Sequence, residues 1–163
     1  MSIDYIEQLA CEFRDALDVV AKRKLYGRLS IFQCFPRGCC RYTSDLLAQF
    51  MLDNGIEANR IEMVEAETNE DNYTHCWLMI DNVLFVDITA DQFNEELYFK
   101  RYTPIPACCL VSRDTYLYEC FNRSKMQFLQ NVGIDSYGGD IPFKLQVVYD
   151  AVIQQINIKR QRR

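Results

Sequence analysis

Three residue types that can form a nucleophilic catalytic site follow one another along this chain. Cys40 stands at the start of an apolar-periodic segment, directly after the turn Phe35-Pro36-Arg37-Gly38-Cys39. His75 is the only histidine, and Asp87 follows it by twelve residues. A cysteine attacks as its thiolate, and a helix start and a nearby imidazolium both lower the thiol pKa. The order therefore predicts a nucleophile, a general base and a carboxylate that orients the base.

The connection between the histidine and aspartate segments decides whether the two side chains can meet. Residues 74–80 and 83–88 are nearly continuous apolar runs, which predicts a hairpin turning at Asp81-Asn82. A two-residue turn would send Asp87 to the face opposite His75. A three-residue connection, Ile80 to Asn82, would pair Met79 with Val83 and place His75 opposite Asp87. The remaining face is then wholly apolar, and it comprises Cys76, Leu78, Ile80, Leu84, Val86 and Ile88. A triad requires this odd connection or a bulge.

The other predicted elements are mainly helical. Apolar spacing predicts helices over residues 3–23, with Ser2 as the N-cap, and over residues 40–54, ended by Gly55. Alternation predicts a strand over residues 60–67. We also expect a polar turn at 68–73, irregular structure at 89–105, a helix at 115–130 and a last helix beginning at Asp140 and Pro142. This order of elements is an α+β pattern.

Three short motifs occur in order within residues 36–93. Cys40 is followed by Ser44, Leu47, Gly55-Ile56 and Arg60; His75-Cys76-Trp77 comes next; Val86-Asp87-Ile88-Thr89 is last. Together they resemble the cysteine helix, the histidine strand and the aspartate strand of the transglutaminase-like proteins, a superfamily that shares the papain-like cysteine peptidase core. The resemblance implies a nucleophile helix packed on an antiparallel sheet with flanking helices. Residues 1–35 and 94–163 match no pattern, so the substrate cannot be carried over.

The resemblance also bears on two choices that the residues leave open. Cys39 and Cys40 each head a stripe at helical spacing that can be buried, so periodicity does not decide between them. The spacing to Gly55 in the resemblance favours Cys40. It also suggests that Gln33 assists the Cys40 backbone N–H in an oxyanion hole, as a glutamine does in papain-like peptidases. The alternative is that Gln33 is a surface amide.

Composition narrows the class of protein. The 163 residues fit a single domain spanning 1–163, and the 49% apolar content is globular. A net charge of −5 disfavours nucleic-acid and membrane-surface binding. We expect a cytoplasmic protein, because acidic residues interrupt any secretory segment near the start, and therefore expect reduced thiols. The basic end of the last helix is expected to be a frayed, solvated terminus; it contains Lys159, Arg160, Arg162 and Arg163.

We therefore expect a cysteine-dependent enzyme that transfers an acyl group from a protein or peptide through a thioester, without a cofactor. Hydrolysis, by a peptidase or amidase, is favoured because no second substrate site is identified. A transglutaminase-like acyltransferase or deamidase is the alternative, and a catalytically degenerate binding module is a second one. A zinc site built from Cys39, Cys40, His75 and Cys76 is disfavoured, since adjacent cysteines suit two tetrahedral ligands poorly. Acidic residues before the histidine strand can favour a basic substrate; they are Glu65, Glu67, Glu70 and Asp71.

Overall fold

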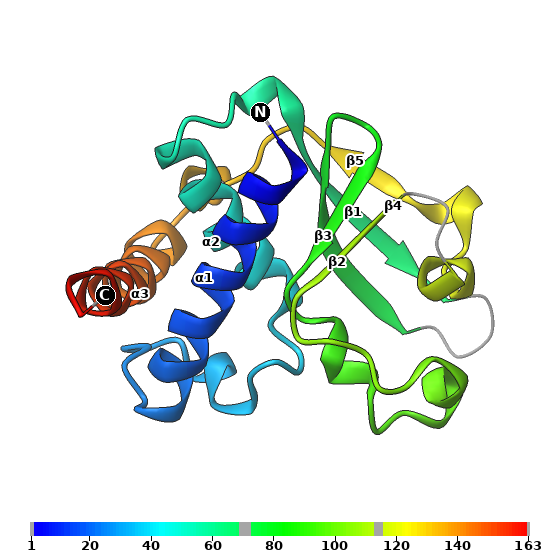
Figure 1. The fold of residues 1–163 in the computed structure, drawn as a ribbon, viewed down its shortest axis with the longest axis horizontal. Helices are drawn as coiled ribbons and strands as arrows, with labels where there is room; N and C mark the ends of the chain where they lie inside the picture. The colour runs from blue at the N-terminus through cyan, green and yellow to red at the C-terminus, as the bar shows by residue number, and fades with distance from the viewer. Residues whose placement is uncertain (1, 69–72, 113–115, 163) are drawn as a thin grey trace.

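The chain folds into long helices and an antiparallel sheet. The computed structural model describes residues 2–68, 73–112 and 116–162 (Figure 1). Within them lie the helices α1 (Ile3–Lys22), α2 (Cys40–Asp53) and α3 (Ile141–Gln161). The strands are β1 (Ile61–Glu67), β2 (Thr74–Ile80), β3 (Leu84–Asp87), β4 (Cys109–Ser112) and β5 (Gln127–Leu129). The sheet order is β4-β3-β2-β1-β5, so β2 is the central strand.

The three predicted long helices are confirmed, together with their end signals. Ser2 caps α1, because its side-chain oxygen accepts a hydrogen bond from the Tyr5 N–H (3.3 Å). α2 ends at a left-handed glycine, Gly55, with φ of 85°. The Ile56 N–H then bonds back to the Met51 carbonyl (3.0 Å), which satisfies one of the free carbonyls at the helix end. α3 carries a proline in its first turn, as the sequence predicted.

The helices cover one face of the sheet and form the larger core (Figure 1). The sheet contributes the face predicted to be wholly apolar. Its buried members are Cys76, Leu78, Ile80, Val86 and Ile88. α3 adds the predicted stripe Leu145, Val148, Val152 and Ile156. The basic end of α3 differs from the expectation, because Lys159 pairs with Asp15 and Arg160 with Glu12, both on α1.

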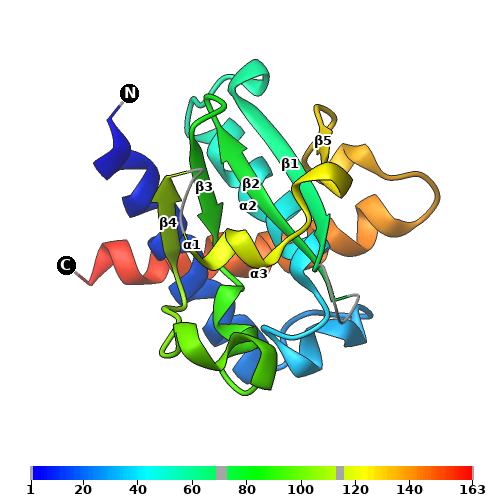
Figure 2. The ribbon, with the colours of Figure 1, turned by 90° about the vertical axis from the view of Figure 1, so that its right-hand side faces the viewer.

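A second, aromatic core covers the opposite face of the sheet. Trp77, Met79 and Phe85 point into it from β2 and β3. Aromatic side chains from the chain between β3 and β5 pack against them: Phe93, Phe99, Tyr118 and Phe121. The described part of this segment consists of short 3-10 turns and the strand β4 (Figure 2). Two cores on two faces explain why β2 is buried along almost its whole length.

The helix predicted over residues 115–130 is wrong. In the described part of that range the chain forms 3-10 turns at Tyr116–Cys120 and Arg123–Lys125, followed by β5. β5 pairs with the outer edge of β1 over Met63–Glu65, and the Asn122 N–H donates to the Glu67 carbonyl (2.7 Å). These bonds satisfy the backbone of an otherwise unpaired strand edge, a requirement that local periodicity does not reveal. β4, which pairs with β3, was also not predicted.

The β2–β3 hairpin has the odd connection that a triad requires, in a different register from the expected one. Ile80 pairs with Leu84, so the connection is Asp81-Asn82-Val83 and not Ile80 to Asn82. Asp81 and Asn82 both adopt left-handed φ values, 53° and 60°, which their short polar side chains tolerate. The shift is two residues, which preserves the face of every side chain. If this register is continued by one residue, Asp87 falls opposite Trp77, diagonal to His75 and on the face where the two side chains meet.

The predicted polar turn falls mostly on residues 69–72, outside the described ranges. No helix in the described part of the chain combines the length and the apolar character needed to cross a membrane.

Candidate active site

The predicted histidine–aspartate pair is formed and fully enclosed. His75 Nε2 lies 2.6 Å from Asp87 Oδ2, and each residue is only 1% exposed. The same carboxylate oxygen accepts a bond from the Tyr118 hydroxyl (3.1 Å). Its other oxygen accepts from the Thr89 N–H (2.9 Å) and the Thr89 hydroxyl (3.2 Å). A buried carboxylate needs such partners to remain charged, and here every partner is a donor that fixes its orientation.

Aromatic rings hold the imidazole in place. The edge of the His75 ring meets Phe93 at a centroid distance of 4.9 Å, and Phe121 stacks at 5.9 Å. Trp77, two residues along β2, lies 5.5 Å away. These rings belong to the aromatic core, so water is kept from this side of the His75–Asp87 pair. Interactions between the charged forms are stronger in such a medium than in water.

Gln92 contacts the other imidazole nitrogen, and sequence reasoning did not identify it. Its Nε2 lies 3.2 Å from His75 Nδ1 and donates to the Thr89 carbonyl (2.9 Å). Gln92 sits in a short 3-10 turn, Ala90–Phe93, directly after the aspartate strand. An amide N–H at this distance can donate to Nδ1 only while the imidazole is neutral with its proton on Nε2, which is the state of His75 after it has given up a proton. Only the position of Gln92 five residues after Asp87 could have signalled this role.

Cys40 is the first residue of α2, the helix start that the sequence predicted. A hydrogen bond from the Cys76 thiol lowers the Cys40 pKa most, burial opposes this, and His75 lowers it further, to about 4. α2 is anchored beside β2 by the Ser44 hydroxyl, which donates to the Cys76 carbonyl (3.3 Å). The thiolate form of Cys40 is therefore favoured by its neighbours on β2, in addition to the helix start.

Cys39, the competing thiol, is more deeply buried than Cys40 and has a raised pKa. It is 1% exposed, its thiol faces the Pro36 carbonyl (3.5 Å), and it accepts a bond from the Thr43 hydroxyl (3.6 Å). Burial raises the pKa of Cys39 to about 12. A thiol that stays protonated at neutral pH is a poor nucleophile. The structure thus separates two adjacent cysteines that helical periodicity could not.

The His75 imidazole is poised to carry a proton. Burial alone would lower its pKa, but the Asp87 carboxylate and the Cys40 thiol raise it to about 10. The pKa of Asp87 is below its usual value: burial opposes this, while His75, Thr89 and Tyr118 favour the carboxylate. The directions of the Cys40 and His75 pKa shifts both favour a Cys40 thiolate beside a His75 imidazolium.

The labelling of Cys40 by iodoacetamide is expected to change little between about pH 5 and about pH 8. The Cys40 pKa lies below this window and the His75 pKa above it, so the thiolate–imidazolium pair persists throughout. An ordinary thiol with a pKa of about 8.5 would react roughly tenfold more slowly for each pH unit lost. Peptide mapping at each pH measures the labelling of Cys40 and of the exposed Cys34, which is the internal control. Parallel pH profiles for Cys34 and Cys40 would contradict the assignment.

A cavity of about 280 Å³ opens beside His75 and Cys76. Two ion pairs line it, Arg41 with Glu65 and Lys125 with Glu67. Both predicted acidic residues that the structure describes therefore stand at the cavity, but each is already paired with a base. Glu70 and Asp71 lie outside the described residues. The charges of these two pairs cancel, which gives no preference for a basic substrate.

Gln33 is exposed, in a 3-10 turn (Ser30–Cys34) before the cysteine helix. Neither Gln33 nor Cys40 is among the residues that line the cavity beside His75. The assignment of Gln33 to an oxyanion hole therefore stays a prediction, and its exposure agrees equally with the surface-amide alternative.

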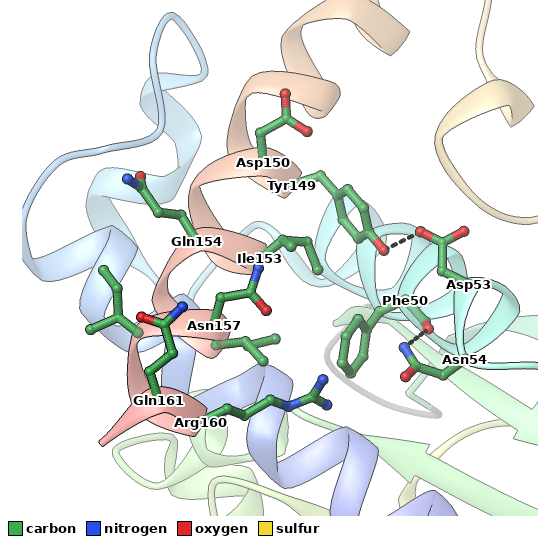
Figure 3. A pocket seen from close by; sticks show the side chains of 12 residues that line it. Phe50, Asp53, Asn54, Tyr149, Asp150, Ile153, Gln154, Asn157, Arg160 and Gln161 are labelled. Carbon is green, nitrogen blue, oxygen red and sulfur yellow. Dashed lines mark hydrogen bonds between the residues drawn. The ribbon is translucent and has the colours of Figure 1, made fainter. Parts of the chain in front are cut away.

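Two other features bear on ligands. Among residues 2–68, 73–112 and 116–162, no group of three or more His, Cys, Asp or Glu side chains is arranged to hold a metal ion. A cavity of about 610 Å³ lies away from the triad, between the end of α2 and α3 (Figure 3). Tyr149 donates to Asp53 (2.5 Å) across it. Neither a histidine nor a cysteine lines it, so this larger cavity includes neither Cys40 nor His75.

Comparison with known proteins gives no relative: no family model, no curated protein and no solved structure matches this chain. The functional argument therefore depends on the site itself.

Proposed function

We propose that this protein is a cysteine-dependent acyl-transfer enzyme with a papain-like core, in which Cys40 is the nucleophile, His75 the general base and Asp87 the orienting carboxylate. One observation carries the proposal. The only histidine is buried, is bound through Nε2 to a fully hydrogen-bonded aspartate, and is one of the groups that lower the pKa of the thiol that begins α2. Since Asp87 engages Nε2, Nδ1 is the nitrogen left to exchange a proton with Cys40.

The arrangement of elements supports the papain-like comparison. A helix that begins at the cysteine packs on the central strand of an antiparallel sheet, and that strand carries the histidine. The next strand carries the aspartate. This is the order and pairing that the three sequence motifs implied for the transglutaminase-like superfamily.

The chemistry follows from the protonation states. The Cys40 thiolate attacks an amide carbonyl, and the carbonyl electron pair moves to oxygen. As the pair returns, the C–N bond breaks and the His75 imidazolium gives its proton to the departing amine, which leaves a thioester on Cys40 and a neutral imidazole. A water molecule then attacks the thioester carbonyl through its oxygen, and His75 takes a proton from that water. Cys40 departs as a thiolate, and the imidazolium is restored.

Water is the favoured acceptor of the acyl group. The cavity beside His75, at about 280 Å³, lies just below the ~300–1,000 Å³ typical of small-ligand sites. Such a volume accommodates one short peptide segment more readily than an acyl donor and an amine together. The remaining sides of the imidazole are occupied by Phe93, Phe121 and Trp77. A peptidase or amidase fits these dimensions better than an enzyme that joins two large substrates.

Acylation of the intact protein tests the proposal. We expect p-nitrophenyl esters of N-acetylated amino acids to give a covalent adduct, seen by intact mass after an acid quench and removed by hydroxylamine as a thioester. Cys40→Ala should abolish the adduct, and Cys39→Ala is the matched control that should retain it. His75→Ala should slow it strongly. Added methylamine should leave the free acid as the main product if water is the normal acceptor.

Other outcomes are equally informative. A dominant methylamide product would make the protein an acyltransferase. An unacylated, normally folded wild-type protein, or an adduct that persists in Cys40→Ala, would overturn the enzymatic assignment in favour of a binding module.

A further inference from the structure

Two cysteines outside the triad face each other at very short range. The sulfur atoms of Cys11 and Cys108 lie 2.7 Å apart, although 97 residues separate them in the sequence. Non-bonded carbon atoms, which are smaller than sulfur, pack at about 3.5–4.0 Å. A disulfide bond is about 2.05 Å long. The two side chains thus already point at each other, and only a small movement of the sulfur atoms would bring them to bonding distance.

The backbone around this pair is held independently of the sulfur atoms. Arg14 lies three residues after Cys11 on α1, and its Nη1 donates to the carbonyl of Ala107 (2.9 Å), the neighbour of Cys108. The same guanidinium forms a two-nitrogen ion pair with Asp91 (2.7 and 2.8 Å). α1 and the segment that leads into β4 are therefore fixed against each other, so bond formation needs little rearrangement of the main chain.

Both thiols are half-buried and are not part of the catalytic constellation. Partial exposure lets a small oxidant reach them, whereas Cys39, Cys76, Cys109 and Cys120 are buried. Burial and the facing Cys11 thiol raise the pKa of Cys108, which agrees with two thiols in direct contact.

We propose that Cys11 and Cys108 are a disulfide-forming pair that reversibly links α1 to the segment preceding β4. With glutathione disulfide as the oxidant, one cysteine thiolate attacks a glutathione sulfur and releases a glutathione thiolate, giving a mixed disulfide. The partner cysteine, after losing its proton, attacks the protein sulfur of that bond and releases the second glutathione thiolate. Two protein thiols are oxidised, one glutathione disulfide is reduced to two thiols, and the two protons pass to them.

The bond would act on the part of the chain that supports the histidine. Gln92 and Phe93, which contact His75, lie in the stretch between β3 and Cys108. A covalent link at Cys108 would limit how far this stretch can move from α1. A bond that closes a loop of this length also restricts the unfolded chain, which raises stability in the chain-entropy account.

Redox titration of the full-length protein tests the pair. After equilibration in glutathione disulfide and digestion with trypsin without reductant, we expect peptide 1–14 linked to peptide 102–113, lighter by two hydrogens than the separate peptides. The link should disappear in Cys108→Ser and persist in Cys109→Ser, which distinguishes the adjacent thiols. The melting temperature should be higher in the oxidised form by roughly 5–15 °C. Cys34→Ser, at an exposed thiol, should keep this shift, and Cys11→Ser should lose it.

Two results would overturn the inference. One is glutathione adducts on Cys11 and Cys108 with no linked peptide in the wild-type protein, a measurement that needs no variant to fold. The other is a link that survives in Cys108→Ser. The bond does not depend on Cys40, so Cys40→Ala should retain it even if the proposed enzymatic activity fails its own test.

Discussion

Replacing Asp87 with asparagine is expected to reduce the rate of Cys40 acylation by about 10³- to 10⁴-fold while the protein remains folded. The Asp87 carboxylate accepts a hydrogen bond from the N–H at His75 Nε2 (2.6 Å). An asparagine amide can instead donate to Nε2, which moves the imidazole proton to Nδ1. Nδ1 is the atom that must take the Cys40 proton, so the base would be in the wrong tautomer. The side chain keeps its size, and hydrogen bonds from Thr89 can persist.

The measurement is the acylation rate by the p-nitrophenyl esters, followed by intact mass, together with thermal melting to verify the fold. Asp81→Asn provides a matched control, because Asp81 is a hairpin aspartate bound to Arg60 away from the triad. It should acylate at the wild-type rate. If Asp87→Asn acylates within a few-fold of Asp81→Asn, Asp87 has a structural role and the triad assignment fails.

The sequence predicted the parts of this site that depend on local order and parity. Cys40 at a helix start, His75 on a strand and Asp87 on the next are all found there, because helical spacing and apolar runs specify those elements directly. The argument that only an odd connection brings His75 and Asp87 to one face is confirmed. The register was two residues off, since the left-handed pair Asp81-Asn82 extends the turn to Val83, which is 62% exposed.

The residues that complete the site could not be predicted in this way. Tyr118 reaches Asp87 across 31 positions, and Phe121 reaches His75 across a longer interval. Their segment has no regular period, because its shape follows from pairing with β1 and packing on the aromatic core. Such contacts are decided by tertiary structure, which is also why a helix was wrongly predicted there.

Arg14 is a second residue whose importance only the structure reveals. It lies among the buried residues of α1 and is only 5% exposed, although its side chain is charged. Its Nη1 donates to the Ile88 carbonyl (2.5 Å) as well as to Ala107, and its Nε to Asp18 (3.0 Å). The guanidinium also lies over the Phe35 ring, with Cζ 4.7 Å from its centroid. One buried charge thus joins α1 to both ends of the segment that supports His75.

Substituting Arg14 with methionine is expected to lower the free energy of unfolding by about 3–5 kcal/mol. Methionine fills much of the same volume, but it leaves Asp91 without its bidentate partner and two main-chain carbonyls without a donor. Removing one member of a buried ion pair leaves the other charge uncompensated, and this dominates the cost. Urea unfolding should be measured in excess reductant, so that a Cys11–Cys108 bond cannot mask the loss.

Arg160→Met is the matched control for this measurement, because Arg160 on α3 forms a bidentate pair with Glu12 on α1 and its own side chain is 49% exposed. Surface pairs of this kind contribute about 0–1 kcal/mol, so Arg160→Met should unfold close to the wild-type midpoint. If the two variants lose similar stability, Arg14 does not anchor the 88–108 segment. If Arg14→Met is destabilised as expected, Cys40 labelling at about pH 5 should also slow, because Gln92 and Phe93 are then held less firmly against the imidazole.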